Sequence, residues 1–225
     1  MDKDAPMIAR TRLIPLAVAA LGATVLTGCK SSGEIVVDQG VGITAVRSRC
    51  PAVGIPDYTG DITLFAQPGN RNADNIDVTA AMTNVRTQCN DAGEQVYASV
   101  SFDVLARRTG TQGARQVTLP YFVTVLRGGS AVVTKRVGQV TVNFADGQDR
   151  AQARGEGSAY IDRQAATLPA DIRERITRKR KAGDADAALD PLADPEVKAA
   201  VEAASFELLV GFQLDERQLA YNATR

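Results

Sequence analysis

Three cysteines, Cys29, Cys50 and Cys89, are the residues of this sequence best suited to covalent chemistry. Histidine and tryptophan are absent. Without histidine, the Ser-His-Asp and Cys-His mechanisms are excluded, and so are most zinc sites. Carboxylate chemistry is compatible with the composition, but no paired-carboxylate motif supports it. The sequence therefore predicts no catalytic residue, no cofactor and no metal site, in a protein that is not an enzyme.

Cys29 closes an apolar run near the N-terminus. Arg10 and Arg12 precede LIPLAVAALGATVL, a run of about 14 residues, whereas a membrane-spanning helix needs about 20. A basic region, a short apolar region and small residues before a cut site are the layout of a secretory signal peptide. A plain secretory signal, in which the cysteine is incidental, is the simpler interpretation.

The run ends in Leu26-Thr27-Gly28-Cys29, which resembles the bacterial lipobox. The resemblance implies that the Cys29 sulfur receives diacylglycerol, that the signal is cut between Gly28 and Cys29, and that an acyl chain such as palmitate is added to the new N-terminus. A thiolate suits this role because it is the nucleophilic form of cysteine. Two or three acyl chains make a stable membrane anchor, whereas one chain does not.

Lys30 follows the cysteine. In well-studied bacterial lipoproteins an aspartate at this place retains the protein in the inner membrane, so the resemblance implies transport to the outer membrane, on its periplasmic face. The expected partners are the membrane, reached through the lipid, and an envelope protein complex. The 26 basic and 26 acidic residues balance. Nucleic-acid-binding domains usually show a basic excess, so no nucleic-acid partner is expected.

Cys50 and Cys89 remain once Cys29 is assigned to the lipid. Export places them in an oxidising compartment, where a lone pair predicts a disulfide. The bridge would close a loop of about 40 residues and stabilise the fold by roughly 3 to 4 kcal/mol. Two free buried thiols are the alternative. A redox-active pair is disfavoured, since the spacing is not CxxC.

Period-two alternation after Cys50 predicts half-buried strands. In EQVYASVSFDVLARR, the apolar residues from Val96 to Val104 point one way, and Tyr97, Ser99, Ser101 and Asp103 point the other. The NDAG turn predicts that residues 75–89 and 94–108 form a hairpin, with Cys89 near its tip. Residues 115–144 are expected to form a second hairpin that turns at Gly128 and Gly129.

Seven or so short strands favour a mainly β fold, an immunoglobulin-like antiparallel β-sandwich with a short helical insertion before the last strand. The predicted parts are a lipoprotein signal peptide at 1–28, a lipidated N-terminus and tether at 29–48, and the sandwich at 49–222. The insertion covers about 165–204, with helices at 169–182 and 195–204. EIVV in the tether is a candidate strand, and DERQLAYN a helical turn begun by Asp215.

The insertion carries the basic run RERITRKRK. One interpretation is docking to anionic lipid, to peptidoglycan carboxylates or to an acidic partner. The other, which we favour, is a solvated helix face beside the acids of DADAALD. The candidate contact residues are Arg173, Arg175, Arg178, Lys179, Arg180 and Lys181.

Four motifs, SRCP, LPYFVTVLRGG, VTKRVGQVTV and VGFQLDERQLAYN, resemble a group of alphaproteobacterial cell-envelope lipoproteins. The resemblance covers roughly residues 48–162 and 205–222. By analogy with lineage-specific lipoproteins that are accessory to envelope assembly complexes, it implies a non-enzymatic structural or protein-binding role. The alternative is a lipid-anchored binder or carrier of a lipid or small-molecule ligand.

Overall fold

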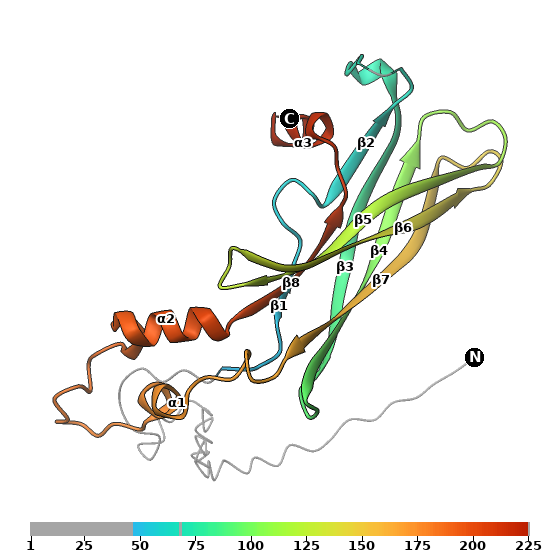
Figure 1. The fold of residues 1–225 in the computed structure, drawn as a ribbon. Helices are drawn as coiled ribbons and strands as arrows, with labels where there is room; N and C mark the ends of the chain where they lie inside the picture. The colour runs from blue at the N-terminus through green and yellow to red at the C-terminus, as the bar shows by residue number, and fades with distance from the viewer. Residues whose placement is uncertain (1–46, 68, 225) are drawn as a thin grey trace, which may run out of the picture. The chain divides into compact units, whose positions relative to one another are not determined.

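The computed structural model describes residues 47–67 and 69–224. The predicted signal peptide, the lipobox with Cys29, Lys30 and the EIVV strand lie outside the described residues. Within them the chain is mainly β, and eight strands form two four-stranded sheets (Figure 1). The mainly β prediction is therefore confirmed at this level.

The first sheet has the order β2-β3-β4-β7, and all its neighbouring strands are antiparallel. β3 and β4 form the predicted hairpin. The inward alternation predicted for β4 is confirmed, because Val96, Val100 and Val104 are at most 1% exposed. The strands are β2 (Asp61–Phe65), β3 (Ile76–Asn90), β4 (Gln95–Arg108) and β7 (Arg150–Asp162).

The second sheet has the order β1-β8-β5-β6. β5 and β6 form the second predicted hairpin, and Gly128 and Gly129 supply the positive φ angles, 61° and 76°, that the turn requires. β1 pairs in parallel with β8, so the prediction of a wholly antiparallel fold is wrong for this pair. The strands are β1 (Ala52–Gly54), β5 (Arg115–Arg127), β6 (Ala131–Phe144) and β8 (Phe206–Phe212).

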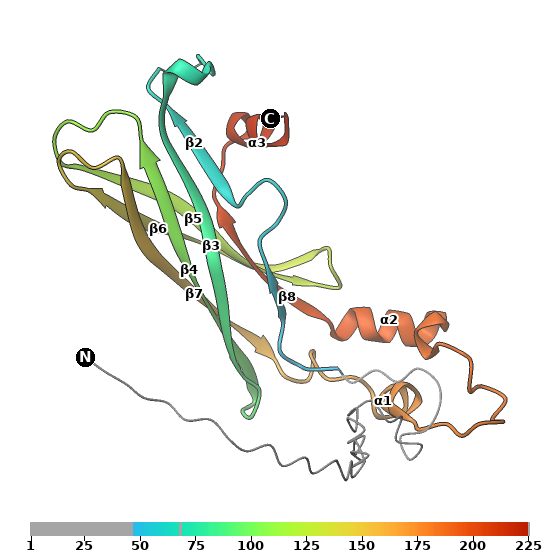
Figure 2. The same ribbon diagram turned by 180° about the vertical axis from the view of Figure 1, so that it is seen from behind.

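The main core lies between the two sheets, and β5 and β6 cross over β4 and β7 in both views (Figures 1 and 2). The LPYFVTVL segment of β5 is built into this arrangement. Leu119, Val123 and Val125 on its inward face are buried, and Thr124 on the other face is buried as well. This segment is therefore a core strand. Buried core side chains include Ile62, Val78, Met82, Phe102, Leu119, Val123, Val125, Val142, Phe144, Leu208, Val210 and Phe212.

The insertion between β7 and β8 holds a small core of its own, formed by Ile172 and Ile176 with Val197 and Val201. Its helices are α1 (Ala170–Thr177) and α2 (Pro195–Ala204). The short 3-10 helix η3 (Pro191–Ala193) lies between them, directly before α2. The second predicted helix is confirmed, but the first is five residues too long, since it ends at Thr177 instead of residue 182. Arg178 leaves the helix with an extended ψ of 126°, which lets the chain turn and bury Arg180.

The C-terminal helix α3 (Glu216–Thr224) lies beside β2 in both views (Figures 1 and 2). Asp215 begins it as predicted, because its carboxylate accepts from the Gln218 backbone N–H while the Gln218 side chain accepts from the Asp215 backbone N–H. Asn222 is buried, and its side-chain amide donates to the Tyr58 and Asp61 carbonyls, each at a distance of 2.8 Å. The helix is thus pinned to the start of β2.

Two further contacts hold parts of the two-sheet fold together, one near each end of the sheets. The Cys50–Cys89 disulfide is present, which confirms that prediction, and it joins the segment before β1 to the end of β3. At the other end, Arg108 is 2% exposed and donates hydrogen bonds to the carbonyls of Gln148, Thr111 and Ala145, each with a donor–acceptor distance of 2.8 Å. Arg108 therefore holds together the β4–β5 and β6–β7 loops, which are two of the connections between the sheets.

Candidate binding surface

The outward face of the β2-β3-β4-β7 sheet carries the most exposed side chains of its strands. Tyr97 and Leu105 of β4 are 36% and 49% exposed, and Tyr160 of β7 is 61% exposed. The side chains predicted to point away from the core on β4, from Tyr97 to Asp103, lie on this face. We call it the outward face.

Strand register places the outward side chains of one end in three rows across β3, β4 and β7. The first row is an amide and two tyrosines, whose rings lie 5.0 Å apart at a tilt of 45°. The second row holds an amide and two hydroxyls, and the third holds a guanidinium, a hydroxyl and a carboxylate. The rows are Asn90, Tyr97 and Tyr160; Gln88, Ser99 and Ser158; and Arg86, Ser101 and Glu156.

A bulge in β3 interrupts the outward face between Thr83 and Arg86. Asn84 in this bulge has a φ of 52°, and its amide donates to the Asp103 carboxylate over 2.7 Å. Asparagine suits this place because it tolerates the left-handed region better than most residues. The bulge thus satisfies the carboxylate of Asp103.

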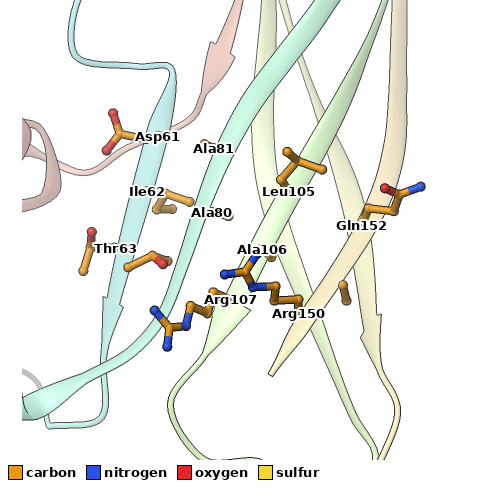
Figure 3. Close-up of a pocket in the computed structure, with 12 residues that line it drawn as sticks. Asp61, Ile62, Thr63, Ala80, Ala81, Leu105, Ala106, Arg107, Arg150 and Gln152 are labelled. Atoms are coloured by element: carbon orange, nitrogen blue, oxygen red, sulfur yellow. The ribbon is translucent and has the colours of Figure 1, made fainter. Parts of the chain in front are cut away.

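A trough of about 680 Å³ lies at the other end of the outward face (Figure 3). Small side chains of β3, Thr79 and Ala81, lie beside Leu105 of β4. Arg107 and Arg150 are direct neighbours across β4 and β7. Like charges that face each other across strands destabilise a sheet. The pair therefore adds positive charge to the trough and does not stabilise the strand pairing.

Asp149 balances part of this charge, because its carboxylate lies 3.3 Å from the Arg107 Nε atom. Within residues 47–67 and 69–224, Arg150 forms no ion pair. Asp61, from β2, also lines the trough. The trough therefore combines an apolar floor with one balanced and one unbalanced guanidinium.

A larger cleft, of about 1010 Å³, lies where β6 of one sheet faces β7 of the other. Tyr121 of β5 crosses it, and its hydroxyl donates to the Glu156 carbonyl over 2.6 Å. Burial raises the pKa of the Tyr121 hydroxyl further above its ordinary value of 10.0, and the protonated group is a donor at neutral pH. The lining includes Arg86, Ser99, Arg136, Val137, Gly138, Arg154, Glu156 and Ser158.

Three of the six basic residues named as candidate contacts are bound to acids within the insertion. Arg175 donates to Asp194 over 2.5 Å and to Glu196 over 3.1 Å. Arg178 and Arg180 both pair with Asp186, an acid of the DADAALD segment. The hydrogen bond from Arg180 is the main cause that lowers the pKa of Asp186, with the charge of Arg178 adding to it. These arginines are engaged inside the insertion.

The other three basic residues are Arg173, Lys179 and Lys181. Arg173 lines a separate cleft of about 720 Å³ beside Arg49 and Asp91, near the disulfide. Lys179 and Lys181 are exposed, and neither forms an ion pair within the described part of the chain. The six residues therefore do not form one continuous basic face.

No protein family, curated protein or solved structure matches this chain. Among residues 47–67 and 69–224, no cluster of three or more acidic, histidine or cysteine side chains is arranged to hold a metal ion. None of the helices in that part is both long and apolar enough to cross a membrane.

Sequence patterns did not predict the trough or the large cleft. Alternation indicated which residues of β4 point outward, but it does not indicate which strand lies next to them. Arg107 and Arg150 are separated by 43 positions, and the sheet order alone brings them together. The cleft requires β6 and β7 to end up in different sheets, for which no local signal exists.

Proposed function

We propose that this protein is a lipid-anchored, non-enzymatic binding protein of the cell envelope, held at the periplasmic face of the outer membrane. The lipobox resemblance and Lys30 support the anchor and the address. The outward face of the β2-β3-β4-β7 sheet is the surface through which it binds a partner protein. An accessory place in an envelope assembly complex follows from this proposal.

The observation that carries the proposal is the composition of the outward face. Tyrosine and arginine are enriched in protein interfaces, and exposed Tyr97, Tyr160 and Leu105 share this face with several arginines. Arg150 on this face forms no ion pair among the described residues, so we expect the partner surface to offer an acidic group to it. The charged outward residues of the sheet are Arg86, Arg107, Arg150 and Arg154, with Asp61, Asp103, Glu156 and Asp162.

The immunoglobulin-like arrangement is also part of the proposal. Two packed four-stranded sheets, a disulfide and loops that cross between the sheets support it. Such a sandwich suits a binding role, because a rigid core presents a sheet face with little loss of conformational entropy on binding.

Photo-crosslinking in cells tests the binding role. A crosslinking amino acid is placed at Tyr97 or at Leu105 of the full-length protein, and at Tyr58 as a matched control, since Tyr58 is 55% exposed but lies outside the outward face. We expect the same envelope protein in crosslinks from positions 97 and 105, and not from 58. Crosslinks from position 58 alone would show that the binding surface is not the outward face. Turnover of an envelope substrate by the purified protein would contradict the non-enzymatic role.

Membrane fractionation tests the anchor separately. Replacement of Cys29 by serine removes the sulfur that the lipid needs, so we expect the protein to leave the outer-membrane fraction. Mass spectrometry of the native N-terminal peptide should show diacylglycerol on Cys29. An unmodified N-terminus elsewhere in the chain would show that the leader is a plain secretory signal.

The trough of Figure 3 supports a second candidate function, the binding of a lipid or small molecule. Its floor contains Ala81 and Leu105, and Arg107 and Arg150 border it. An amphiphile with an anionic group matches this combination. Native mass spectrometry of the purified protein should then retain such a ligand, and the substitution Arg150→Gln should release it.

A further inference from the structure

Two open strand edges line the large cleft. β6 is the last strand of its sheet and pairs only with β5, and β7 is the last strand of the other sheet and pairs only with β4. Arg136, Val137 and Gly138 of β6 and Glu156 and Ser158 of β7 line the same cleft. An open edge presents unpaired backbone N–H and C=O groups, which are a template for another strand.

Hydrogen bonds of the neighbouring strand establish which groups of β6 point into the open edge. The Pro120 carbonyl accepts from the Gln213 backbone N–H over 2.9 Å, so Pro120 directs its backbone toward β8. Backbone direction alternates along a strand, so Tyr121 points to β6 and pairs there with Gly138. The N–H and C=O of Val137, one residue away, therefore point away from β5.

The same argument applies to β7. The Glu156 carbonyl accepts from the Tyr121 hydroxyl, so it points away from β4. Ser158, two residues later, directs its backbone the same way. Tyr121 thus satisfies one open carbonyl of the β7 edge, whereas Val137 and Ser158 have no ladder partner on this side among the described residues.

Charges around the cleft select the occupant. Arg86, Arg136 and Arg154 line it against Glu156 as the single carboxylate among the lining residues. Val137, which lines the cleft and is 60% exposed, offers an apolar contact on β6. An extended segment that alternates apolar and acidic side chains is complementary to both features.

We infer that the cleft between β6 and β7 binds an extended, acidic segment of a partner protein, which adds to the open edge of β6 as a further strand. This inference rests on the proposed function and specifies how the partner is held. A second copy of this chain is a poorer match than an acidic segment, because the cleft is lined by three arginines and the β6 strand carries exposed Lys135 and Arg136, so its own edge would add like charge.

Peptide binding to the purified full chain tests the inference. The probes are a synthetic peptide of alternating valine and glutamate and its valine–lysine counterpart of equal length. Amide hydrogen exchange reports the site, and we expect the acidic peptide to slow exchange at Val137 of β6 by about tenfold or more, as in a hydrogen-bonded strand. The lysine peptide should leave this amide unchanged.

Two substitutions separate backbone pairing from side-chain contact. Val137→Pro removes the outward N–H and is tolerated on an edge strand, so we expect it to weaken binding of the acidic peptide at least about tenfold. Val137→Thr keeps the N–H and the β-branched shape and should bind like the wild type. Arg154→Glu lies on β7 and should weaken binding through charge, which keeps the test decisive if Val137→Pro unfolds the protein.

Three outcomes would overturn the inference. The acidic and lysine peptides could bind equally or not at all, Val137→Pro could bind as tightly as Val137→Thr, or the Val137 amide could already be protected in the full chain without peptide, which would mean that the chain fills the cleft itself. Crosslinks from Leu105, which does not line the cleft, are independent of these results, so the proposed binding role keeps an experiment of its own; Tyr97 lines the cleft and would report on both.

Discussion

The Tyr121 hydroxyl donates to the Glu156 backbone carbonyl over 2.6 Å and thereby joins β5 of one sheet to β7 of the other. The two residues are 35 positions apart. The bond lies in the cleft between the two open edges and spans the gap between the sheets. Tyr121 also packs edge-on against Phe102, with ring centroids 5.0 Å apart, so the ring is held from both sides.

Tyr121→Phe should lower the free energy of unfolding by about 1 kcal/mol, because the Glu156 carbonyl loses a donor while the ring contacts remain. Urea unfolding followed by circular dichroism measures this change. Tyr97→Phe serves as control, since Tyr97 is exposed on the outward face and should change stability little. Equal losses in both variants would mean that the bond to Glu156 contributes nothing specific.

Arg108→Met should destabilise the protein by about 3 kcal/mol. The guanidinium is buried, lies 5.3 Å from the Phe144 ring centre, and supplies donors to three loop carbonyls that the methionine would leave without them. Arg107→Met is the matched control, because Arg107 is an exposed neighbour whose ion pair with Asp149 is worth little. A stable Arg108→Met variant would contradict the role assigned to this residue.

Gly155→Ala should cost about 2 kcal/mol, since a Cβ atom at this position would lie 2.2 Å from the Phe102 Cζ atom on the opposite strand. Combining it with Phe102→Leu should recover part of the loss by making room. Gly110→Ala, where a Cβ meets nothing within 4 Å, should be close to neutral. Thermal unfolding of the four proteins checks the series, and no recovery in the double variant would argue against the clash.

Asp77 and Arg115 form a two-bond ion pair, with both distances 2.6 Å. The hydrogen bonds from Arg115 lower the pKa of Asp77 below its usual value of 3.8. A lowered pKa in the folded state contributes stability above the unfolded value and loses it as the pH falls through the folded value. Asp77→Asn should therefore remove up to about 1 kcal/mol at neutral pH, a modest amount because the pair is partly exposed.

The test of this ion pair is unfolding by urea at several pH values between about 2 and 7. The wild type should lose more stability than Asp77→Asn as the pH falls below about 4, so that the two curves converge. Asp57→Asn controls for general charge effects, since Asp57 is exposed. Parallel curves for wild type and Asp77→Asn would contradict the prediction.

The double substitution of Cys50 and Cys89 by serine should reduce the free energy of unfolding by roughly 3 to 4 kcal/mol, because the unfolded chain loses a closed loop. The wild type in a reducing agent should approach the same stability. If reduction left the unfolding midpoint unchanged, the bridge would not stabilise the sandwich.

The local sequence pattern was sufficient to predict the two hairpins and which side chains of their strands point into the core. β4 alternates apolar and polar side chains, and a strand places successive side chains on opposite faces whatever its neighbours are. The turn residues after Cys89 and at Gly128 then determine where each hairpin reverses. The first helix of the insertion was overestimated because residues 178–182 favour a helix locally, whereas Arg178 and Arg180 turn toward Asp186, a contact that helix propensity does not include.

The sequence by itself determined the mainly β class, the two hairpins, the Cys50–Cys89 bridge and, through the lipobox resemblance, an expected lipid anchor. Each depends on residues close together in the chain or on a pair with no competitor. Only the tertiary structure decided that Arg107 lies beside Arg150, that Arg108 is buried under three carbonyls, and that β6 and β7 leave a cleft between open edges. These features depend on how distant strands are ordered and registered, which is set by the packing of the whole core.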